Sequence, residues 1–418
     1  MNSEEILRLV ERIENGDKQA EMELKESALK GDVLAETALG KLCLEGKNFP
    51  KSKELGEKLL RSAAGKGNSE AQYLVGMLLE SGNNPEKNYR EALQLYSEAA
   101  SQNHPGAMVR LGMFLERGGF VRKDYDQAFK LFEMAADYGD VDGMRKLGEA
   151  YMLGRGVSQN YVEAINWLNR AALNNNALAY SLLAEMYYHG YGVAIDLKRV
   201  VYLYTIAAEA GDESSQLKVG QILLKGEGAK QNIEEALTWI HKSADQKHAP
   251  ALYALGILYE EGNEVDKDLE EAAKWYKLAA LEEYPPAQLK LGILYYNGVG
   301  VEQTYTRAAY WFLTAAENEN SEALYWLAEL FAEGKGVETD LLSAYIMMAM
   351  SGNSYEPAKK FVDSYFQNLS PKEQQLAPAI LRNAVKNPKL FTVAIDEGRA
   401  RPGETSPSLE YNRQFRPI

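Results

Sequence analysis

The chain has 418 residues, of which 46% are hydrophobic and 25% charged, a composition that excludes a collagen-like, proline-rich or wholly disordered protein. The 60 Asp and Glu residues outnumber the 46 Lys and Arg residues, so the formal net charge is −14. Because this charge repels phosphate backbones, nucleic acid is not expected as the main ligand. The single cysteine, Cys43, excludes an internal disulfide framework and a cysteine-based zinc cluster.

The first residues are acidic and amphipathic, and they lack the basic region and apolar run of a secretory signal. No apolar stretch approaches the roughly 20 residues that span a bilayer. We therefore expect a cytoplasmic protein without membrane insertion.

A period of 36 residues runs through most of the chain. A small residue after Leu or Val, here called the anchor, recurs at Gly40, Gly76, Gly112, Gly148, Ala184, Gly220, Gly256, Gly292 and Ala328. A glycine follows six residues after every anchor, from Gly46 to Gly334. The pattern predicts nine consecutive repeats of one supersecondary unit, in place of the two or three domains that the length alone suggests.

Each repeat is predicted to contain two helices. Around the anchor, small, leucine and aromatic residues share one helical face, and the later glycine is placed to end that first helix in a left-handed conformation. The second helix is expected to begin after a side chain that caps its free amides. These predicted caps are Ser52, Asn88, Asp124, Asn160, Asp196, Asn232, Asp268, Thr304 and Asp340. Large residues of the second helix are expected to fill the gaps between repeats, namely Leu59, Leu95, Leu131, Trp167, Leu203, Trp239, Trp275, Trp311 and Met347.

The pattern Ala-x-x-x-Leu-Gly-x-x-Tyr-x-x-Gly-x-Gly-Val, then Asn/Asp-x-x-x-Ala-x-x-Trp-x-x-x-Ala-Ala, is nearly complete over residues 287–316 and 251–280. It resembles the Sel-1-like repeat, which is related to the tetratricopeptide repeats. The resemblance implies an all-α fold, a right-handed α-α superhelix or solenoid, that binds other proteins.

The register of the repeats also divides the chain. We expect an N-terminal half-repeat cap over residues 1–31 and nine repeats over residues 32–352. C-terminal capping helices are expected over residues 353–395, with one helix around Ala358–Tyr365 and another starting at Ser370-Pro371. The polar, aperiodic residues 396–418 are predicted to be a flexible tail.

Signals for catalysis, metal binding or a cofactor are weak. Cys43 occupies a position that holds Leu, Tyr or Phe in the other repeats, so we expect a core residue and not a nucleophile. His241 and His248 flank one turn and could meet, but no acidic partner is fixed by spacing, and surface histidines are the favoured reading. We therefore expect neither a cofactor nor a metal site, and an enzyme is the least favoured function.

Candidate binding residues come from the first helices, which by analogy with tetratricopeptide stacks line the concave wall. Their non-core positions carry Tyr, Met and Leu interspersed with carboxylates, a composition typical of interfaces. The candidates are Tyr73, Met77, Met113, Met152, Tyr188, Tyr253, Ile257, Ile293, Tyr296, Tyr325 and Trp326. The alternative is that these side chains merely pack between neighbouring first helices. For Trp326, contact with the C-terminal cap is favoured over a role as a partner's anchor.

These features favour a non-catalytic scaffold or adaptor that binds a protein or peptide on the concave surface. The acidic balance favours a basic partner through electrostatic steering. The alternative is a dedicated inhibitor, such as an immunity protein that occludes a toxin or enzyme. The identity of the partner and the oligomeric state stay open at this point.

Overall fold

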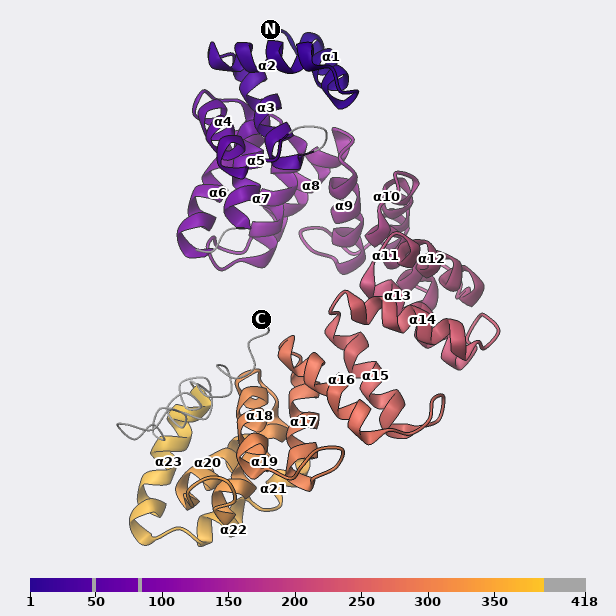
Figure 1. Cartoon of the computed structure of the whole chain (residues 1–418). Helices are drawn as coiled ribbons and strands as arrows, with labels where there is room; N and C mark the ends of the chain where they lie inside the picture. Colours follow the sequence, from indigo (N-terminus) through magenta and orange to yellow (C-terminus); the bar gives the residue numbers. More distant parts are fainter. Residues whose placement is uncertain (47–49, 82–84, 387–418) are drawn as a thin grey trace. The chain divides into compact units, whose positions relative to one another are not determined.

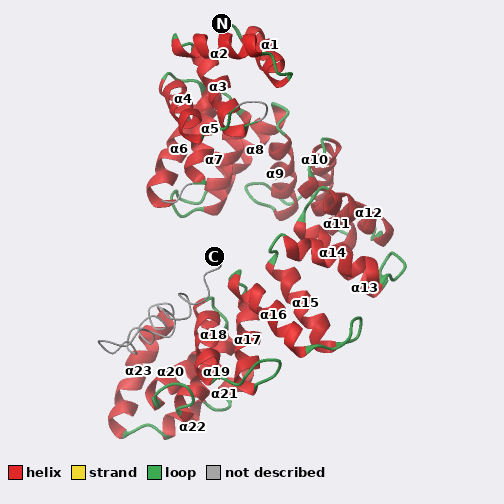
Figure 2. Ribbon diagram, viewed as in Figure 1, coloured by secondary structure: helices red, strands yellow, loops and turns green. Residues whose placement is uncertain are grey.

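The computed structural model describes residues 1–46, 50–81 and 85–386. These residues form 23 α-helices and no strand (Figure 2). The chain divides into two units, unit 1 over Met1–Ala210 and unit 2 over Gly211–Ile418. Figure 1 labels the helices in chain order. Within each unit, a helix packs against the next one along the chain, so that the helical pairs stack as the repeat pattern predicts.

The helices of unit 1 alternate between first and second helices of the repeats from α3 onward. They are α1 (Ser3–Glu14), α2 (Lys18–Leu29), α3 (Val33–Glu45), α4 (Lys53–Gly65), α5 (Ser69–Glu80), α6 (Pro85–Ser101), α7 (Pro105–Arg117), α8 (Tyr125–Asp137), α9 (Val141–Leu153), α10 (Tyr161–Leu173), α11 (Ala177–His189) and α12 (Leu197–Glu209).

Unit 2 continues the alternation and then adds three helices after the last repeat. Its helices are α13 (Glu213–Lys225), α14 (Ile233–Asp245), α15 (Ala249–Glu261), α16 (Leu269–Leu281), α17 (Pro285–Asn297), α18 (Tyr305–Glu317), α19 (Ser321–Glu333), α20 (Leu341–Ser351), α21 (Glu356–Lys359), α22 (Val362–Gln367) and α23 (Pro371–Lys386).

The ends of the first helices follow the predicted glycine rule. The glycine six residues after the anchor adopts the left-handed conformation at Gly46, Gly154, Gly190, Gly226, Gly262, Gly298 and Gly334. Gly118 also has a positive φ of 73°, but its ψ of −161° differs. Gly82 lies outside the described residues. A residue with a β-carbon is strained at positive φ, which explains why glycine recurs there.

The predicted caps of the second helices are confirmed at seven positions. Side chains accept a hydrogen bond from the first turn at Ser52, Asp124, Asn160, Asp196, Asn232, Asp268 and Asp340. The prediction is wrong for Asn88, because α6 already begins at Pro85. Thr304 precedes α18 but makes no capping hydrogen bond, since its hydroxyl donates to the carbonyl of Glu302 at 3.2 Å.

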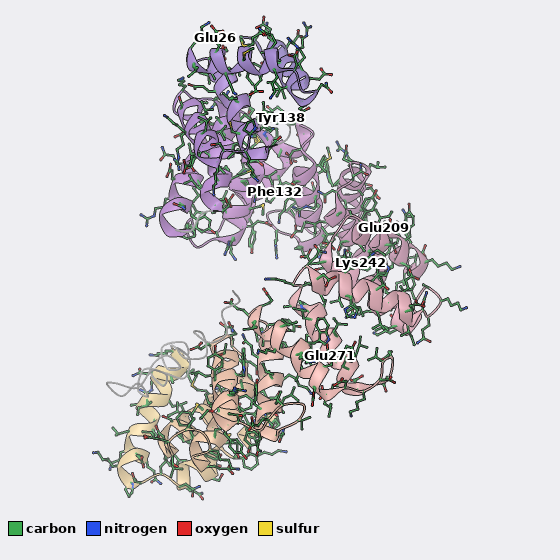
Figure 3. The ribbon with its side chains drawn as sticks, in the orientation of Figure 1. Glu26, Phe132, Tyr138, Glu209, Lys242 and Glu271 are labelled. Atoms are coloured by element: carbon green, nitrogen blue, oxygen red, sulfur yellow. The ribbon has the colours of Figure 1, made fainter. Side chains whose placement is uncertain are left out.

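The two helices of a repeat cross where the anchor meets a large side chain of the second helix. A β-carbon added to any of the seven anchor glycines would lie only 2.5–2.8 Å from that side chain. At Gly112 the neighbour is the ring of Phe132, labelled in Figure 3, whose side chain is 1% exposed. The close approach therefore depends on the missing β-carbon.

This large side chain lies 20 residues after the anchor, and it is buried in every repeat. The residues are Leu60, Tyr96, Phe132, Leu168, Tyr204, Ile240, Tyr276, Phe312 and Met348. Our prediction named the residue just before it, and only Leu203, Trp311 and Met347 of that set are buried. The others are half-buried. The principal gap-filling position is thus one residue later, because one helical step rotates a side chain by about 100°.

The two ends of the chain extend the stack. Residues 1–31 contain both α1 and α2, and Ile6, Leu9 and Ile13 of α1 join the buried core of the first repeat. At the other end, the helix expected around Ala358–Tyr365 is divided into α21 and α22, whereas α23 begins at Pro371 as predicted. The tail predicted for residues 396–418 lies outside the described residues, as do residues 387–395 of the expected cap. No helix of the described part is long and apolar enough to cross a membrane.

The anchor contact yields a stability prediction. We expect Gly76→Ala to lower the free energy of unfolding by about 1–3 kcal/mol, because the new β-carbon overpacks against the ring of Tyr96, 2.6 Å away. The control is Gly65→Ala in the adjacent helix α4, where no atom lies within 4 Å of the added carbon. There alanine should be neutral or stabilising by up to about 1 kcal/mol. Chemical denaturation of both variants checks this, and equal destabilisation would contradict it.

A second prediction concerns the N-terminus of α15. His248 makes no capping hydrogen bond, whereas Asn68 and Asn176 at the same repeat position cap their helices. We expect His248→Asn to raise the free energy of unfolding by up to about 1 kcal/mol. His104→Asn is the control and should bring no such gain, because His104 already accepts from the backbone N–H of Ala107 at 3.2 Å.

The gain from His248→Asn should also depend on pH. Burial lowers the pKa of His248 below its ordinary value of 6.5. The unfolded chain then binds more protons than the folded chain between the two values, so the native protein loses stability as the pH falls through 6.5. Thermal midpoints measured from pH 7.5 down to about 5.5 should therefore favour the Asn variant increasingly. A pH-independent difference would refute this role of His248.

Candidate functional site

The first helices of neighbouring repeats contact one another directly, as α7 does with α9 and α9 with α11. We call the side chains three and two residues before the anchor, and one and four residues after it, the first-helix surface. Ion pairs join this surface from repeat to repeat. Glu80 lies 3.9 Å from Arg110, Glu116 lies 3.0 Å from Lys146, and Glu260 lies 2.9 Å from Lys290.

The predicted binding residues all lie on this surface, divided between the two units. Five belong to unit 1, namely Tyr73, Met77, Met113, Met152 and Tyr188, and six belong to unit 2, namely Tyr253, Ile257, Ile293, Tyr296, Tyr325 and Trp326. Tyr188 is exposed to 41% of its surface, and the other ten are half-buried. Each therefore keeps some surface for a partner while also contacting its neighbours.

Packing between helices accounts for part of this burial. The ring of Tyr73 stacks on His104 with centroids 4.7 Å apart. Tyr253 lies 5.3 Å from Tyr276 and 5.5 Å from Tyr284, again between ring centroids. Burial raises the pKa of both Tyr73 and Tyr253, so their hydroxyls stay protonated near neutral pH. These contacts fix the rings in place, and rigid aromatic side chains lose little entropy on binding.

Trp326 occupies a position that holds a cation in several other repeats and Ala or Leu in the rest. Arg110, Lys146 and Lys290 are each paired there with a carboxylate of the preceding repeat, and Tyr296 stands in the place of that carboxylate. The rings of Tyr296 and Trp326 lie 5.4 Å apart. An aromatic pair thus occupies the place of an ion pair.

We expected Trp326 to contact the C-terminal cap, and its neighbour Tyr325 lies 5.6 Å from Tyr355 and 6.3 Å from Phe361 of that cap, between ring centroids. Trp326 stacks on Phe312 of the preceding repeat, with centroids 6.0 Å apart and planes at 15°. Its own contact with the cap stays a prediction.

A cleft of about 350 Å³ opens on the first-helix surface of unit 1. It is lined by Glu80, Met113, Phe114, Glu116, Arg117, Lys123, Tyr125, Lys146 and Arg155. Only Met113 of this set was among the predicted binding residues. The charged residues were missed because each is unremarkable in its own repeat. Only the packing of α5, α7, α9 and the loops that follow α7 and α9 brings them to one place.

A tyrosine–carboxylate pair recurs across the crossing of the two helices. The hydroxyl of Tyr96 donates to Glu80, and the hydroxyl of Tyr276 donates to Glu260 at 2.6 Å. Burial and these bonds raise the pKa of both tyrosines, so both hydroxyls remain donors near neutral pH. These pairs were not predicted, although the tyrosine follows the glutamate by 16 residues in both repeats.

Cys43, His241 and His248, the residues considered for chemistry, all make packing contacts or hydrogen bonds within the fold. Cys43 is buried in α3, and burial raises the pKa of its thiol, which confirms the predicted core position. His241 packs against the ring of Trp275, whereas His248 bonds Ser243 at 2.9 Å. In the part of the chain that the structure describes, no three His, Cys, Asp or Glu side chains converge as metal ligands would.

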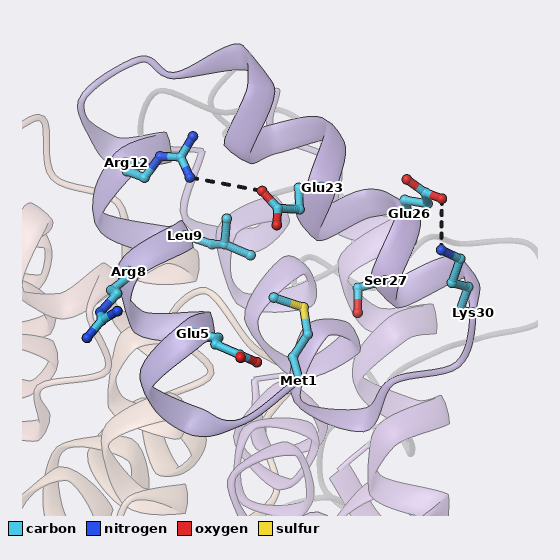
Figure 4. A pocket seen from close by; sticks show the side chains of 9 residues that line it. All are labelled: Met1, Glu5, Arg8, Leu9, Arg12, Glu23, Glu26, Ser27 and Lys30. Carbon is cyan, nitrogen blue, oxygen red and sulfur yellow. Dashed lines mark hydrogen bonds and ion pairs between the residues drawn. The ribbon is translucent and has the colours of Figure 1, made fainter.

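A second pocket, of about 460 Å³, lies between α1 and α2 (Figure 4). Its charged side chains largely pair with one another. Arg12 lies 4.0 Å from Glu23, and Lys30 lies 2.8 Å from Glu26. Because the two signs are balanced, this pocket favours neither an anion nor a cation.

A family model described as Sel1 repeat matches nine consecutive segments of the chain. They are residues 33–68, 69–104, 105–140, 141–176, 177–212, 214–248, 249–284, 285–320 and 321–353. No curated protein matches the sequence.

Solved structures give further similarities. A Sel1 repeat protein from Oxalobacter formigenes is 26% identical, with a TM-score of 0.56 over 75% of this chain and 92% of that chain. The protective antigen c5321 of uropathogenic Escherichia coli strains, which displays an SLR fold, is 25% identical, with a TM-score of 0.45 over 92% of this chain and 98% of that chain. The immunity protein Pa5087 from Pseudomonas aeruginosa is 20% identical, with a TM-score of 0.28 over 62% of this chain and 80% of that chain.

The matched segments cover most of residues 33–353, and their boundaries coincide with the first and second helices described above. Each matched segment contains one anchor, which packs against the second helix, and the glycine six residues later, which follows the first helix. The chain therefore belongs to the Sel1 repeat family.

Proposed function

We propose that this protein is a non-catalytic scaffold that holds a protein or peptide on its first-helix surface. The observation that carries the proposal is the exchange of an ion pair for the aromatic pair Tyr296–Trp326. The repeat architecture does not require this exchange, because Glu260 and Lys290 occupy the same two positions one repeat earlier. Half-exposed Tyr and Trp side chains are the type that contributes most to binding protein partners.

The surroundings of the pair support the same function. Lys335 lies 5.9 Å from the ring centroid of Tyr296 and 5.5 Å from that of Tyr305, so a cation already rests against these rings. Burial raises the pKa of Tyr296, which leaves its hydroxyl able to donate a hydrogen bond. The net charge of −14 favours encounter with a partner of net positive charge, and we place that encounter in the cytoplasm.

One experiment changes the aromatic pair into the ion pair of the preceding repeat. We expect the double variant Tyr296→Glu, Trp326→Lys to bind a captured partner at least about tenfold more weakly, because two buried aromatic contacts are lost. Its helices should keep their stability, since neighbouring repeats contain the same Glu–Lys pair. The matched control is Leu278→Lys on α16, a side chain exposed to 46% on a second helix. If titration calorimetry shows undiminished affinity of the double variant, the assignment of this surface as the binding site is wrong.

A second experiment compares two exposed tyrosines of unit 1. A photo-crosslinking amino acid is placed at Tyr188 on α11, exposed to 41%, or at Tyr202 on α12, exposed to 64%. We expect protein adducts from position 188 and few from position 202, although 202 is the more exposed of the two. Gel mobility and mass spectrometry identify the adducts. Adducts of equal yield at both positions would show that the first helices are not the binding surface.

A further inference from the structure

We propose that the cleft of unit 1 binds the carboxylate side chains of an acidic peptide segment. The inference rests on the proposed function, because it names the chemistry of one part of the partner. Four cationic side chains line the cleft, namely Arg117, Lys123, Lys146 and Arg155, against two carboxylates, Glu80 and Glu116. A local excess of positive charge therefore faces the cleft in a chain whose net charge is −14.

Both carboxylates of the cleft are already engaged within the fold. Glu80 accepts from the hydroxyl of Tyr96 and lies 3.9 Å from Arg110. Glu116 lies 3.0 Å from Lys146 and 3.6 Å from Arg155. They stabilise the repeats and do not cancel the remaining cations.

Two cations at the cleft have no such partner. Arg117 ends α7 and Lys123 lies in the loop before α8, and both are exposed. Among the described residues neither forms an ion pair, and the Nζ atom of Lys123 lies 5.5 Å from the ring centroid of Tyr125. Arg155 approaches the same ring at 5.7 Å. Two cations from the loops before α8 and after α9 thus lie against one aromatic ring, and Arg117 at the end of α7 lines the same cleft.

The chemistry of the cleft favours a carboxylate-bearing peptide. Guanidinium groups bind carboxylates through two parallel hydrogen bonds, which Arg117 and Arg155 can both offer. Met113 and Phe114 give the lining an apolar part for the carbon chain of a Glu side chain. The volume of about 350 Å³ suits a few side chains of an extended segment.

Comparison with unit 2 shows that the repeat does not impose these charges. Five repeats later, the places of Arg117, Lys123, Lys146 and Arg155 are held by Asn297, Gln303, Trp326 and Lys335. One cation remains of four, and Trp326 replaces one of the other three. The same position on the repeat thus has a different chemistry in each unit.

The test measures fluorescence anisotropy of labelled, end-blocked peptides with the full chain. One peptide carries four Glu residues, a second carries four Gln residues, and a third carries four phosphoserines. We expect the Glu peptide to bind at least about tenfold more tightly than the Gln peptide at low salt, and more weakly as salt rises. Equal binding of the Glu and Gln peptides would overturn the proposal. Phosphoserine binding tenfold tighter than Glu would overturn the choice of carboxylate.

Two double variants separate the cleft from the overall charge. Arg117→Gln with Lys123→Gln should weaken binding of the Glu peptide about tenfold, as the loss of two charge-assisted contacts predicts. Lys130→Gln with Lys198→Gln removes the same charge from exposed positions on α8 and α12, and should change binding less than about twofold. Circular dichroism confirms that both variants fold. Equal weakening by both pairs would refute the site.

Failure of this proposal can be distinguished from failure of the proposed function. Loss of the peptide preference with crosslinks retained at Tyr188 would remove only the carboxylate assignment. Loss of the crosslinks at Tyr188 would remove the binding surface itself.

Discussion

The contact between the anchor and the side chain 20 residues later is the constraint on which the fold depends. In the seven repeats whose anchor is glycine, the two helices come close enough for a large side chain, such as Tyr276 or Phe312, to lie against the anchor's backbone. The apolar surface removed from water at each crossing then stabilises the pair. The left-handed glycine sets where the first helix ends, and the capping side chain sets where the second helix begins. The repeats of both units use this one arrangement with different large side chains.

Because the crossing fixes the fold, the first-helix surface is free to vary. At one pair of positions the chain places Glu116 with Lys146, Glu260 with Lys290, and Tyr296 with Trp326. Ion pairs and aromatic pairs both satisfy the neighbouring helices, so the choice between them costs the architecture little. Such positions are where a repeat protein acquires specificity, and the basic cleft of unit 1 and the aromatic pair of unit 2 are two results of this freedom.

The sequence predicted the repeats well because their period was uninterrupted. The left-handed glycines and the buried Cys43 followed from position alone. The start of α6 was missed because Asn88 fits the cap pattern while Pro85 begins the helix earlier. The buried position of the second helix was misplaced by one residue, since large side chains occupy both Trp275 and Tyr276 and periodicity cannot rank them. The cleft and the division after Ala210 depend on contacts between repeats, which a uniform period does not reveal. The binding role of the predicted surface residues stays a prediction.

Both members of the anchor contact belong to the same repeat, as Gly292 and Phe312 do. A deletion or duplication of one whole 36-residue segment therefore leaves every such contact intact, whereas a single-residue insertion between the two members breaks one. A change of length by whole repeats therefore preserves the fold, whereas a shorter change inside a crossing does not. The protein can thus gain or lose first-helix surface by changing its number of repeats, because each helix pair keeps its own anchor contact.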